Sequence, residues 1–360
     1  MIWQREFPDV GTVVELGQGS LDNLCIEPDD ILLLDAGIGK KNLEIVKAKF
    51  MNKKRIIPVK GGEGVKSLAN YGKIAKQLVN IGASRNSALF CIGGGATLDL
   101  GGFLAGTYHR GMHLINIPTT LLGMVDSAHG GKNGLNLRGK NVLGSFYMPR
   151  AVSCDIRFLD SLSKQQWDNG LAEIVKTGFV CNPEILDMLK DWPESLERVI
   201  LQCIDEKMKV VALDPRDMNG TRATLNFGHT LGHALEFETG LPHGSAVGMG
   251  QRFAVMLSLD QGLIPQEDAK KALSMLDKWC PEVKLTGSEP KDTKIKDVKP
   301  KNAKPKVANP NRLLALMKRD KKAKDGLRFI LLSGIGEPAF AAVDEPSIEK
   351  VLNEFLVRYG

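Results

Sequence analysis

The first half of the chain alternates short apolar runs with a stretch of helical periodicity. Apolar runs occupy residues 31–34, 55–59, 88–92 and 113–117, and residues 66–81 place their apolar positions at helical spacing. Such an alternation is typical of a parallel sheet with helices on both faces. The pattern therefore predicts an α/β domain with a Rossmann-like sheet over residues 1–159.

From about residue 160 the apolar positions recur at helical spacing in one segment after another. Because this pattern continues to the end of the chain with only two strand-like runs, we expect a mostly α-helical second domain over residues 160–360. The length of 360 residues also favours two domains over one core. The expected helices are 165–180, 183–192, 195–213, 225–238, 246–260, 266–279 and 346–359, and the expected strands are 328–332 and 339–343.

The composition is that of an ordinary soluble protein, with 43% hydrophobic and 25% charged residues. No apolar run reaches the roughly 18 to 20 residues of a membrane helix, and the first residues lack a basic region followed by an apolar one. We therefore expect a cytoplasmic protein with no membrane partner. The six cysteines are scattered without a short Cys-x-x-Cys pair, so neither a disulfide framework nor a thiolate zinc site is indicated.

The formal net charge of +6 raises the question of a nucleic-acid partner. Much of the excess lies between Lys291 and Lys306, which hold seven lysines against two aspartates and include two prolines. This segment has no interleaved aromatic residues on which bases stack. It is best interpreted as a solvated loop at about residues 288–310, and we expect no nucleic-acid partner.

Three features of the first domain indicate a dinucleotide site. The run Gly93–Gly95 lies where a buried strand ends and a helix begins, so that bare amides and the helix dipole can approach a pyrophosphate. Asp35 follows the first apolar run, where a carboxylate can accept a hydrogen bond from a ribose hydroxyl. Thr119 and Thr120 follow a later strand, and Asp99 lies in the helix after the glycines. Taken singly, these are also the signals of tight turns and helix caps.

A cluster of histidines suggests a metal site. Residues 229–243 hold three of the six histidines, and on a helix His229 and His233 are four positions apart and share a face. The additional ligand is expected to be Glu173, because a carboxylate on an apolar helix face is costly to bury without a cation. Two imidazoles and one carboxylate suit a catalytic Zn²⁺ with open positions. The alternatives are structural histidines and a buried ion pair of Glu173 with Lys176.

Basic residues next to glycines or near the histidines indicate an anionic substrate. Arg110, Lys132, Lys140, Lys207 and Arg222 lie in such places, and they suit a substrate that carries phosphate or carboxylate. Taken singly, each of them is also a common surface charge.

These motifs, in this order and spacing, strongly resemble the 3-dehydroquinate synthase family. The resemblance implies a carbon–oxygen lyase of the shikimate pathway, which leads to chorismate and the aromatic amino acids. Such an enzyme closes 3-deoxy-D-arabino-heptulosonate 7-phosphate into 3-dehydroquinate and releases phosphate. It also implies bound NAD⁺, one divalent metal (Zn²⁺ or Co²⁺) and a homodimer. The matching segments are 93–99, 108–111, 118–122, 125–127, 130–132, 139–141, 170–176, 226–229, 243–244 and 320–322 followed by Gly326.

Carried over position by position, the resemblance assigns roles to individual residues. The metal ligands become Glu173, His229 and His243, while His233 moves from the metal to the substrate. The residues that the resemblance places at NAD⁺ are Asp35, Glu63, Lys66, Gly94, Gly95, Asp99, Thr119, Thr120, Lys132, Lys140, Phe158 and Ser161.

The same resemblance distributes the substrate among the remaining polar residues. It places Lys207, Arg222 and Asn226 at the substrate carboxylate, and Asp126 and Lys176 at ring hydroxyls. Arg110 would reach the phosphate from the partner subunit. The other groups at the phosphate would be Lys132, Asn141, His233 and one of Lys321 and Lys322.

Three other functions stay open at this point. The first is another sugar-phosphate cyclase, which makes 2-epi-5-epi-valiolone or a deoxyinosose from a substrate without a carboxylate. The second is a metal-dependent polyol dehydrogenase of the same fold, and the third is a non-catalytic nucleotide-binding protein. Three positions depart from the family pattern, namely His129 in place of a small or apolar residue, Ser245 in place of glutamate and Ser161 in place of threonine.

Overall fold

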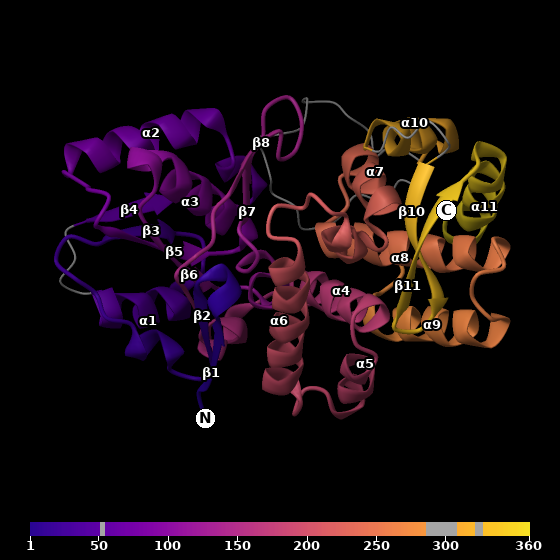
Figure 1. The fold of residues 1–360 in the computed structure, drawn as a ribbon, viewed down its shortest axis with the longest axis horizontal. Coiled ribbons are helices and arrows are strands. Elements are labelled where there is room, and N and C mark those ends of the chain that lie inside the picture. The colour runs from indigo at the N-terminus through magenta and orange to yellow at the C-terminus, as the bar shows by residue number, and fades with distance from the viewer. Residues whose placement is uncertain (51–54, 286–307, 321–326) are drawn as a thin grey trace. The chain divides into compact units, whose positions relative to one another are not determined.

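The computed structural model of this chain describes residues 1–50, 55–285, 308–320 and 327–360 (Figure 1). These residues form two compact units, of which the first holds Met1–Trp167 and Glu194–Met218, and the second holds Asp168–Pro193 and Asn219–Gly360. The segment 194–218, which contains the expected helix 195–213, is thus part of the first unit. The boundary at residue 160 stays a prediction, and most of the expected Lys/Pro-rich loop lies outside the described residues.

The first unit is built on a seven-stranded sheet in the order β1-β2-β9-β6-β5-β3-β4. Only β1 runs antiparallel to its neighbour, and every other pair is parallel, which confirms the predicted sheet. Of these strands, β1, β2 and β9 were not expected from the apolar runs. The strands are β1 (Trp3–Phe7), β2 (Thr12–Leu16), β3 (Ile31–Asp35), β4 (Ile56–Val59), β5 (Ala88–Gly93), β6 (His113–Pro118) and β9 (Ala151–Cys154).

Helices cover both faces of this sheet. In Figure 1, α2 (Leu68–Asn80) and α3 (Gly95–Thr107) lie on one face, and α1 (Lys40–Phe50) lies on the other. Helix α3 approaches the sheet so closely at Gly101 that a Cβ there would lie 2.1 Å from the Cys91 sulfur. Only glycine fits at this position. The unit also contains the short strands β7 (Lys132–Leu135) and β8 (Leu143–Phe146) and helix α6 (Leu196–Leu213).

The carboxyl ends of the parallel strands lie at a single edge of the sheet. In the strand register, Asp35 of β3 pairs with Val59 of β4, and Gly93 of β5 pairs with Pro118 of β6. Ligands of open α/β sheets bind at this edge. The predicted nucleotide residues that follow these strands therefore come from neighbouring strand ends.

The second unit is mostly helical, as predicted, and centres on α8 (His243–Asp260). Helix α8 is buried on nearly all sides, against α7, α9, α11 and β10. Its partner α7 begins at His229 rather than at residue 225, because Gly228 takes a left-handed conformation (φ +78°) at the helix N-cap. The other elements are α4 (Lys164–Val180), α5 (Glu184–Met188), α7 (His229–Thr239), α9 (Gln266–Trp279), α10 (Pro310–Asp320), α11 (Glu345–Tyr359), β10 (Leu327–Gly334) and β11 (Glu337–Val343).

A fully buried arginine ties α8 to the helices around it. The Arg252 guanidinium donates to the carbonyl oxygen of Cys280 at 2.6 Å and pairs with Asp277 of α9 at 3.2 Å. Its Cζ also lies 5.9 Å from the centre of the Tyr359 ring on α11. A buried cation is stable only with such partners, so Arg252 fixes the packing around α8. Among the described residues, no helix is both long and apolar enough to cross a bilayer.

We expect Arg252→Met to destabilise the second unit, because the Cys280 carbonyl then loses its buried donor. The free energy of unfolding in urea should fall by about 2–4 kcal/mol. Lys271→Met is the matched control, since Lys271 forms an exposed ion pair on α9, and it should change the value by less than about 0.5 kcal/mol. Equal effects of the two substitutions would show that Arg252 does not hold the helices together.

Candidate functional site

The carboxylate of Asp35 is held in place at the end of β3. It is 9% exposed, and its Oδ1 accepts hydrogen bonds from the amides of Gly37 at 2.8 Å and Gly61 at 3.0 Å. A Cβ on Gly61 would lie 1.9 Å from the Asp35 Oδ2 atom, so the chain after β4 passes this closely only because the residue is glycine. Asp35 thus has the place and acceptor character that the sequence predicted for it.

The glycine turn after β5 leads directly into α3. Gly94 is the N-cap of this helix, and no side chain caps its first amides. A Cβ on Gly95 would lie 2.7 Å from the Ser127 hydroxyl, and the amide of Thr119 donates to Gly93 at 3.0 Å. The free helix start, with the end of β6 beside it, has the donors that bind a phosphate group.

A buried lysine joins several of the predicted nucleotide residues. The Lys66 ammonium is 4% exposed, and it donates to Asp99 and to Asn141, each at 2.5 Å, with Glu63 at 3.7 Å. Burial raises the pKa of Asp99 to about 6, although Lys66 opposes the shift. The structure therefore brings Asn141, which was expected at the substrate phosphate, into the cluster of predicted NAD⁺ residues.

A second lysine cluster lies in the same unit. Lys207 on α6 donates to the Asp126 carboxylate at 2.6 Å and to the Asp126 carbonyl at 2.5 Å. Asp126 belongs to a single π-helical turn, Gly123–Ser127, and buried His129 holds that turn through a 2.7 Å contact between its Nε2 and the Met124 carbonyl. Burial and the Lys207 charge lower the pKa of His129 to about 4, so this ring is neutral at pH 7 and donates to Met124.

Lys132 is paired with a carboxylate that the sequence analysis missed. Its ammonium lies 2.7 Å from Asp217, which follows α6 and has a left-handed backbone (φ +54°). The two residues are 85 positions apart, so no local pattern indicates this contact. An Asp217 carboxylate beside a lysine predicted to bind phosphate is a further candidate functional group.

Several other predicted residues of the first unit lie in turns and short 3-10 helices. Arg110 and Lys140 are exposed, and Arg110 has a left-handed backbone (φ +65°) that is strained for a residue other than glycine. Asn42 of α1 donates to the Phe158 carbonyl at 3.0 Å and to the Ser161 hydroxyl at 2.8 Å. This places the turn from Phe158 to Ser161 against the start of α1.

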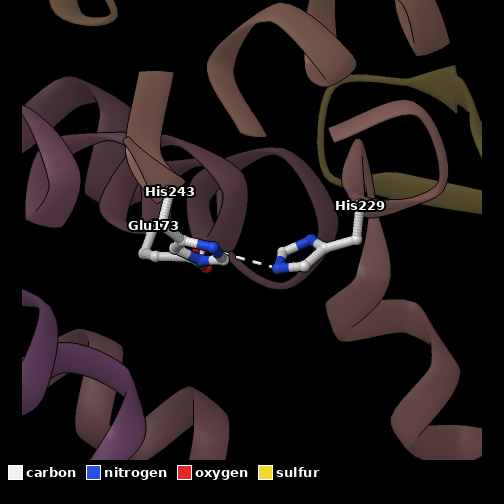
Figure 2. Close-up of side chains that lie close together, drawn as sticks. All are labelled: Glu173, His229 and His243. Carbon is white, nitrogen blue, oxygen red and sulfur yellow. Dashed lines mark hydrogen bonds and ion pairs between the residues drawn. The ribbon is translucent and has the colours of Figure 1, made fainter. Parts of the chain in front are cut away.

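In the second unit, the structure brings together Glu173, His229 and His243 (Figure 2). The Glu173 Oε1 atom lies 3.1 Å from the His243 Nε2 and 3.5 Å from the His229 Nε2. One ligand atom from each of the three residues lies within 4.8 Å of the other two. His233 is exposed one turn along α7, and its ring centre lies 5.2 Å from that of His229, but it is not part of this group.

Each candidate ligand is placed by a specific backbone feature. Glu173 lies in the buried middle of α4, whereas His229 and His243 are the first residues of α7 and α8. The left-handed Gly228 turns the chain into α7, and the His229 Nδ1 is held by the Phe227 carbonyl at 3.2 Å. The Nε2 atoms of both histidines are therefore directed to the carboxylate.

The charge state of the cluster is set by burial and by Lys176. The Glu173 carboxylate is 1% exposed, and burial alone raises its pKa, but Lys176 and the hydrogen bond with His243 hold it well below its usual range. Burial lowers the pKa of His229 to about 3, although Glu173 opposes the shift. Burial also lowers the pKa of His243, but hydrogen bonds with Glu173 and Glu236 outweigh it and raise the pKa to about 9.

These residues fit a divalent metal by their donor chemistry. Two imidazole nitrogens and one carboxylate oxygen converge, and this donor set suits Zn²⁺ or Co²⁺ with positions left for another ligand. The ion pair with Lys176, considered from the sequence as an alternative, is present as well, on the other carboxylate oxygen. Arg222 and Asn226 lie on the short helix Thr221–Asn226, and Arg222 is buried. Lys321 and Lys322 lie outside the described residues.

Comparison with known proteins gives consistent matches along the chain. Residues 56–169 match the family model of the 3-dehydroquinate synthase N-terminal region, and residues 170–323 match that of the C-terminal region. The chain is 42% identical to the 3-dehydroquinate synthase of Sulfolobus acidocaldarius over 61% of this chain and 66% of that protein. It is 37% identical to the 3-dehydroquinate synthase of Solibacter usitatus over 84% of this chain and 82% of that protein.

A solved structure shows the same fold. The chain is similar to 2-deoxy-scyllo-inosose synthase complexed with carbaglucose-6-phosphate, NAD⁺ and Co²⁺, with a TM-score of 0.83 and 26% identity. The match covers 98% of this chain and 99% of that chain. The predicted fold class, an α/β sheet domain followed by a mostly helical region, is confirmed.

We expect Glu173→Ala to abolish metal retention, because the two remaining imidazoles no longer have an anionic partner. The affinity for Co²⁺ should fall on the order of 100-fold or more, measured by metal titration of the purified variant. Glu173→Gln keeps the shape and should lose metal to a similar extent. NAD⁺ binding, which we expect at Asp35 and Asp99 of the other unit, should persist in both variants. Metal retention in both would refute this ligand assignment.

The pH dependence of metal binding follows from the histidine pKa values. Below pH 9 the His243 ring carries a proton that a metal must displace, whereas His229 carries none above pH 3. Metal binding at pH 7.5 should therefore release about one proton, and the affinity should rise with pH until about pH 9. Calorimetric titration in buffers of different ionisation enthalpy measures this proton count. His233→Asn is the control and should leave it unchanged, while zero release by the unmodified protein would contradict the His243 assignment.

Proposed function

The chain belongs to the 3-dehydroquinate synthase family, and we propose that it converts 3-deoxy-D-arabino-heptulosonate 7-phosphate into 3-dehydroquinate and phosphate. The reaction makes it a carbon–oxygen lyase of the shikimate pathway that depends on NAD⁺ and on a divalent metal. The observation that carries this proposal is the convergence of Glu173, His229 and His243 in a chain that also has an uncapped glycine turn at the end of a parallel strand.

We assign the metal to Glu173, His229 and His243, and the dinucleotide to the edge of the sheet that ends in Asp35, Gly94 and Thr119. When bound, the metal supplies a Lewis acid that acidifies the hydroxyl to be oxidised, and NAD⁺ takes up and later returns a hydride. The protein supplies ligands, orientation and fixed charges. Lys176 offsets the charge of the Glu173 oxygen that the imidazoles leave free, and in this proposal it also contacts a ring hydroxyl.

The dinucleotide assignment has support from several independent contacts. Asp35 is already held by two backbone amides, as a carboxylate that accepts from a ribose must be. Lys66 orients the Asp99 carboxyl near the glycine turn and opposes the burial that raises its pKa to about 6. The other residues that we assign to NAD⁺ are Glu63, Gly95, Thr120, Lys132, Lys140, Phe158 and Ser161.

The substrate anions account for the remaining cations. We propose that Lys207, Arg222 and Asn226 bind the substrate carboxylate, and that Asp126 contacts a ring hydroxyl. Lys207 is held by Asp126 and Lys132 by Asp217, so each ammonium is oriented before an anion binds. The phosphate is assigned to Lys132, Asn141, His233 and one of Lys321 and Lys322.

We further propose a cytoplasmic homodimer in which Arg110 of one subunit reaches the phosphate bound by the other. Arg110 is exposed, and its backbone is held in a strained conformation, which is common where a side chain must be presented for a function. The described cysteines are all free, and most are buried, as is usual in a reducing compartment.

Two other reactions are possible on this fold, and particular residues oppose them. A cyclase that makes a deoxyinosose acts on a substrate without a carboxylate, so the buried cations Arg222 and Lys207 would have no substrate carboxylate to bind. A polyol dehydrogenase performs net oxidation and needs no phosphate-binding lysines. The pair Lys132–Asp217 and the pair Lys207–Asp126 therefore favour the synthase.

The purified protein should release phosphate from 3-deoxy-D-arabino-heptulosonate 7-phosphate, and chelation of the metal should abolish the release. Phosphate is measured by a coupled colorimetric assay, with sedoheptulose 7-phosphate as the substrate that lacks the carboxylate. Lys207→Met should lower kcat/KM on the order of 100-fold, since a charge-assisted contact is lost.

Two outcomes would refute the proposed function. One is turnover of sedoheptulose 7-phosphate without turnover of the carboxylate-bearing substrate by the metal-loaded protein. The other is steady NADH production from glycerol, which would indicate a polyol dehydrogenase.

A further inference from the structure

The backbone beside each candidate metal ligand is contacted by an asparagine or glutamine from another helix, through a hydrogen bond next to Glu173 and His243 and through close packing next to His229. Three ligand residues come from three helices, and two of them are the first residues of their helices. The first residue of a helix is held by few intrahelical hydrogen bonds, so its side chain is positioned only if something else fixes it. Gln251 and Asn169 supply such contacts.

Gln251 lies on α8 and has no exposed surface. Its Nε2 donates to the carbonyl oxygen of Ala172 at 2.9 Å, and Ala172 is the residue directly before Glu173 on α4. Its stem also packs against the turn into α7, since a Cβ on Gly228 would lie 2.6 Å from the Gln251 Cγ. One side chain of α8 thus contacts the residue before Glu173 and the residue before His229.

Asn169 makes the matching contact at the third ligand. It lies on α4, one helical turn before Glu173, and its Oδ1 accepts a hydrogen bond from the Gly244 amide at 2.9 Å. Gly244 follows His243 directly, and a Cβ there would lie 2.3 Å from the Asn169 Cα. The start of α8 is therefore held tightly against α4, next to His243.

We propose that Gln251 and Asn169 are positioning residues that preorganise the metal centre before the metal binds. Together they join α4, α7 and α8 at the peptide units adjacent to all three ligands. Groups that orient metal ligands typically contribute 10–100-fold to metal affinity or activity. This inference rests on the proposed metal-binding role of Glu173, His229 and His243, and it adds two residues that do not touch the metal or the substrate.

A purely structural role would give a different result from a positioning role. Packing needs only a side chain of similar volume at residue 251, and methionine supplies that volume. Methionine lacks the donor for Ala172, so Gln251→Met separates the hydrogen bond from the filled space. The matched control is Ser258→Ala, because Ser258 is also fully buried on α8 and bonds to backbone atoms, two turns beyond Gln251.

The test is a Co²⁺ titration of the full chain, read by calorimetry and by the visible absorption of the bound ion. Gln251→Met should weaken Co²⁺ binding about 10–100-fold and change the absorption spectrum, which reports the ligand geometry. Ser258→Ala should lower the melting temperature but leave the Co²⁺ affinity and the spectrum as in the unmodified protein. Unchanged affinity and spectrum in folded Gln251→Met would overturn the role of Gln251.

Asn169 provides a second test that does not depend on how Gln251→Met folds. Asn169→Ala removes the acceptor for the Gly244 amide and should weaken Co²⁺ binding by the same order, about 10–100-fold. Asn169→Asp keeps an acceptor oxygen at that position and should restore the affinity. Equal binding by the alanine and aspartate variants would overturn the role of Asn169.

The titration also separates this inference from the proposed function. If the unmodified protein binds no Co²⁺, or if Glu173→Ala binds it equally well, the metal assignment fails and the positioning role fails with it. If the unmodified protein binds Co²⁺ through Glu173 and the Gln251 and Asn169 variants bind it equally well, only the positioning role fails.

Discussion

The burial of one carboxylate, that of Glu173, is the constraint on which the second unit depends. An ionised carboxylate that is 1% exposed is stable only with cationic or hydrogen-bonding partners on each oxygen. Lys176 pairs with one oxygen, and the imidazoles of His243 and His229 face the other. To bring these partners together, α4, α7 and α8 must pack with almost no side chain between them. That is why a Cβ on Gly250 would lie 1.9 Å from the Gly228 carbonyl oxygen.

The first unit also contains buried charges with internal partners, and here the buried charges are those of lysines. Lys66 is almost fully buried and Lys207 is largely so, and each donates to an aspartate within 2.6 Å. Lys132 is more exposed and pairs with Asp217 at 2.7 Å. A lysine that is held in this way is oriented, but a ligand must compete with its internal anion. A ligand that brings its own phosphate or carboxylate can take the place of that anion, so these pairs suit anion binding better than permanent structural roles.

Much of the fold was predictable because buried positions of a helix or strand are apolar and recur at the period of that element. The central strands β3 and β5 are almost wholly buried and therefore read as continuous apolar runs, whereas β6 is interrupted by the buried Asn116. The helices of the second unit were recognised from the helical spacing of their apolar positions. Strands β1 and β8 alternate between exposed and partly buried positions, and this weaker pattern gave no prediction. The predicted start of α7 was wrong because the spacing of apolar residues does not show that Gly228 has a left-handed conformation. Strand ends, the glycine turn and the histidine cluster indicated part of the site, including Asp35, Glu173 and His229, and motif resemblance added the rest. Asp217 and Gln251 could not be found, since their contacts join positions 79 to 85 residues apart.

The two interpretations of Glu173 that the sequence left open, an ion pair and a metal ligand, are compatible because a carboxylate has two oxygens. Lys176 pairs with Oε2, and Oε1 is the atom nearest to both imidazoles. A divalent cation at Oε1 would therefore join a cluster in which Lys176 already offsets the charge of Glu173, and the Glu236 carboxylate 3.6 Å from the His243 Nδ1 adds one further negative charge. Such a centre carries a net positive charge in a buried setting, where charge interactions are stronger than in water. It favours an anionic substrate and the negative charge that develops on an oxygen during oxidation, and a neutral polyol gains less from it.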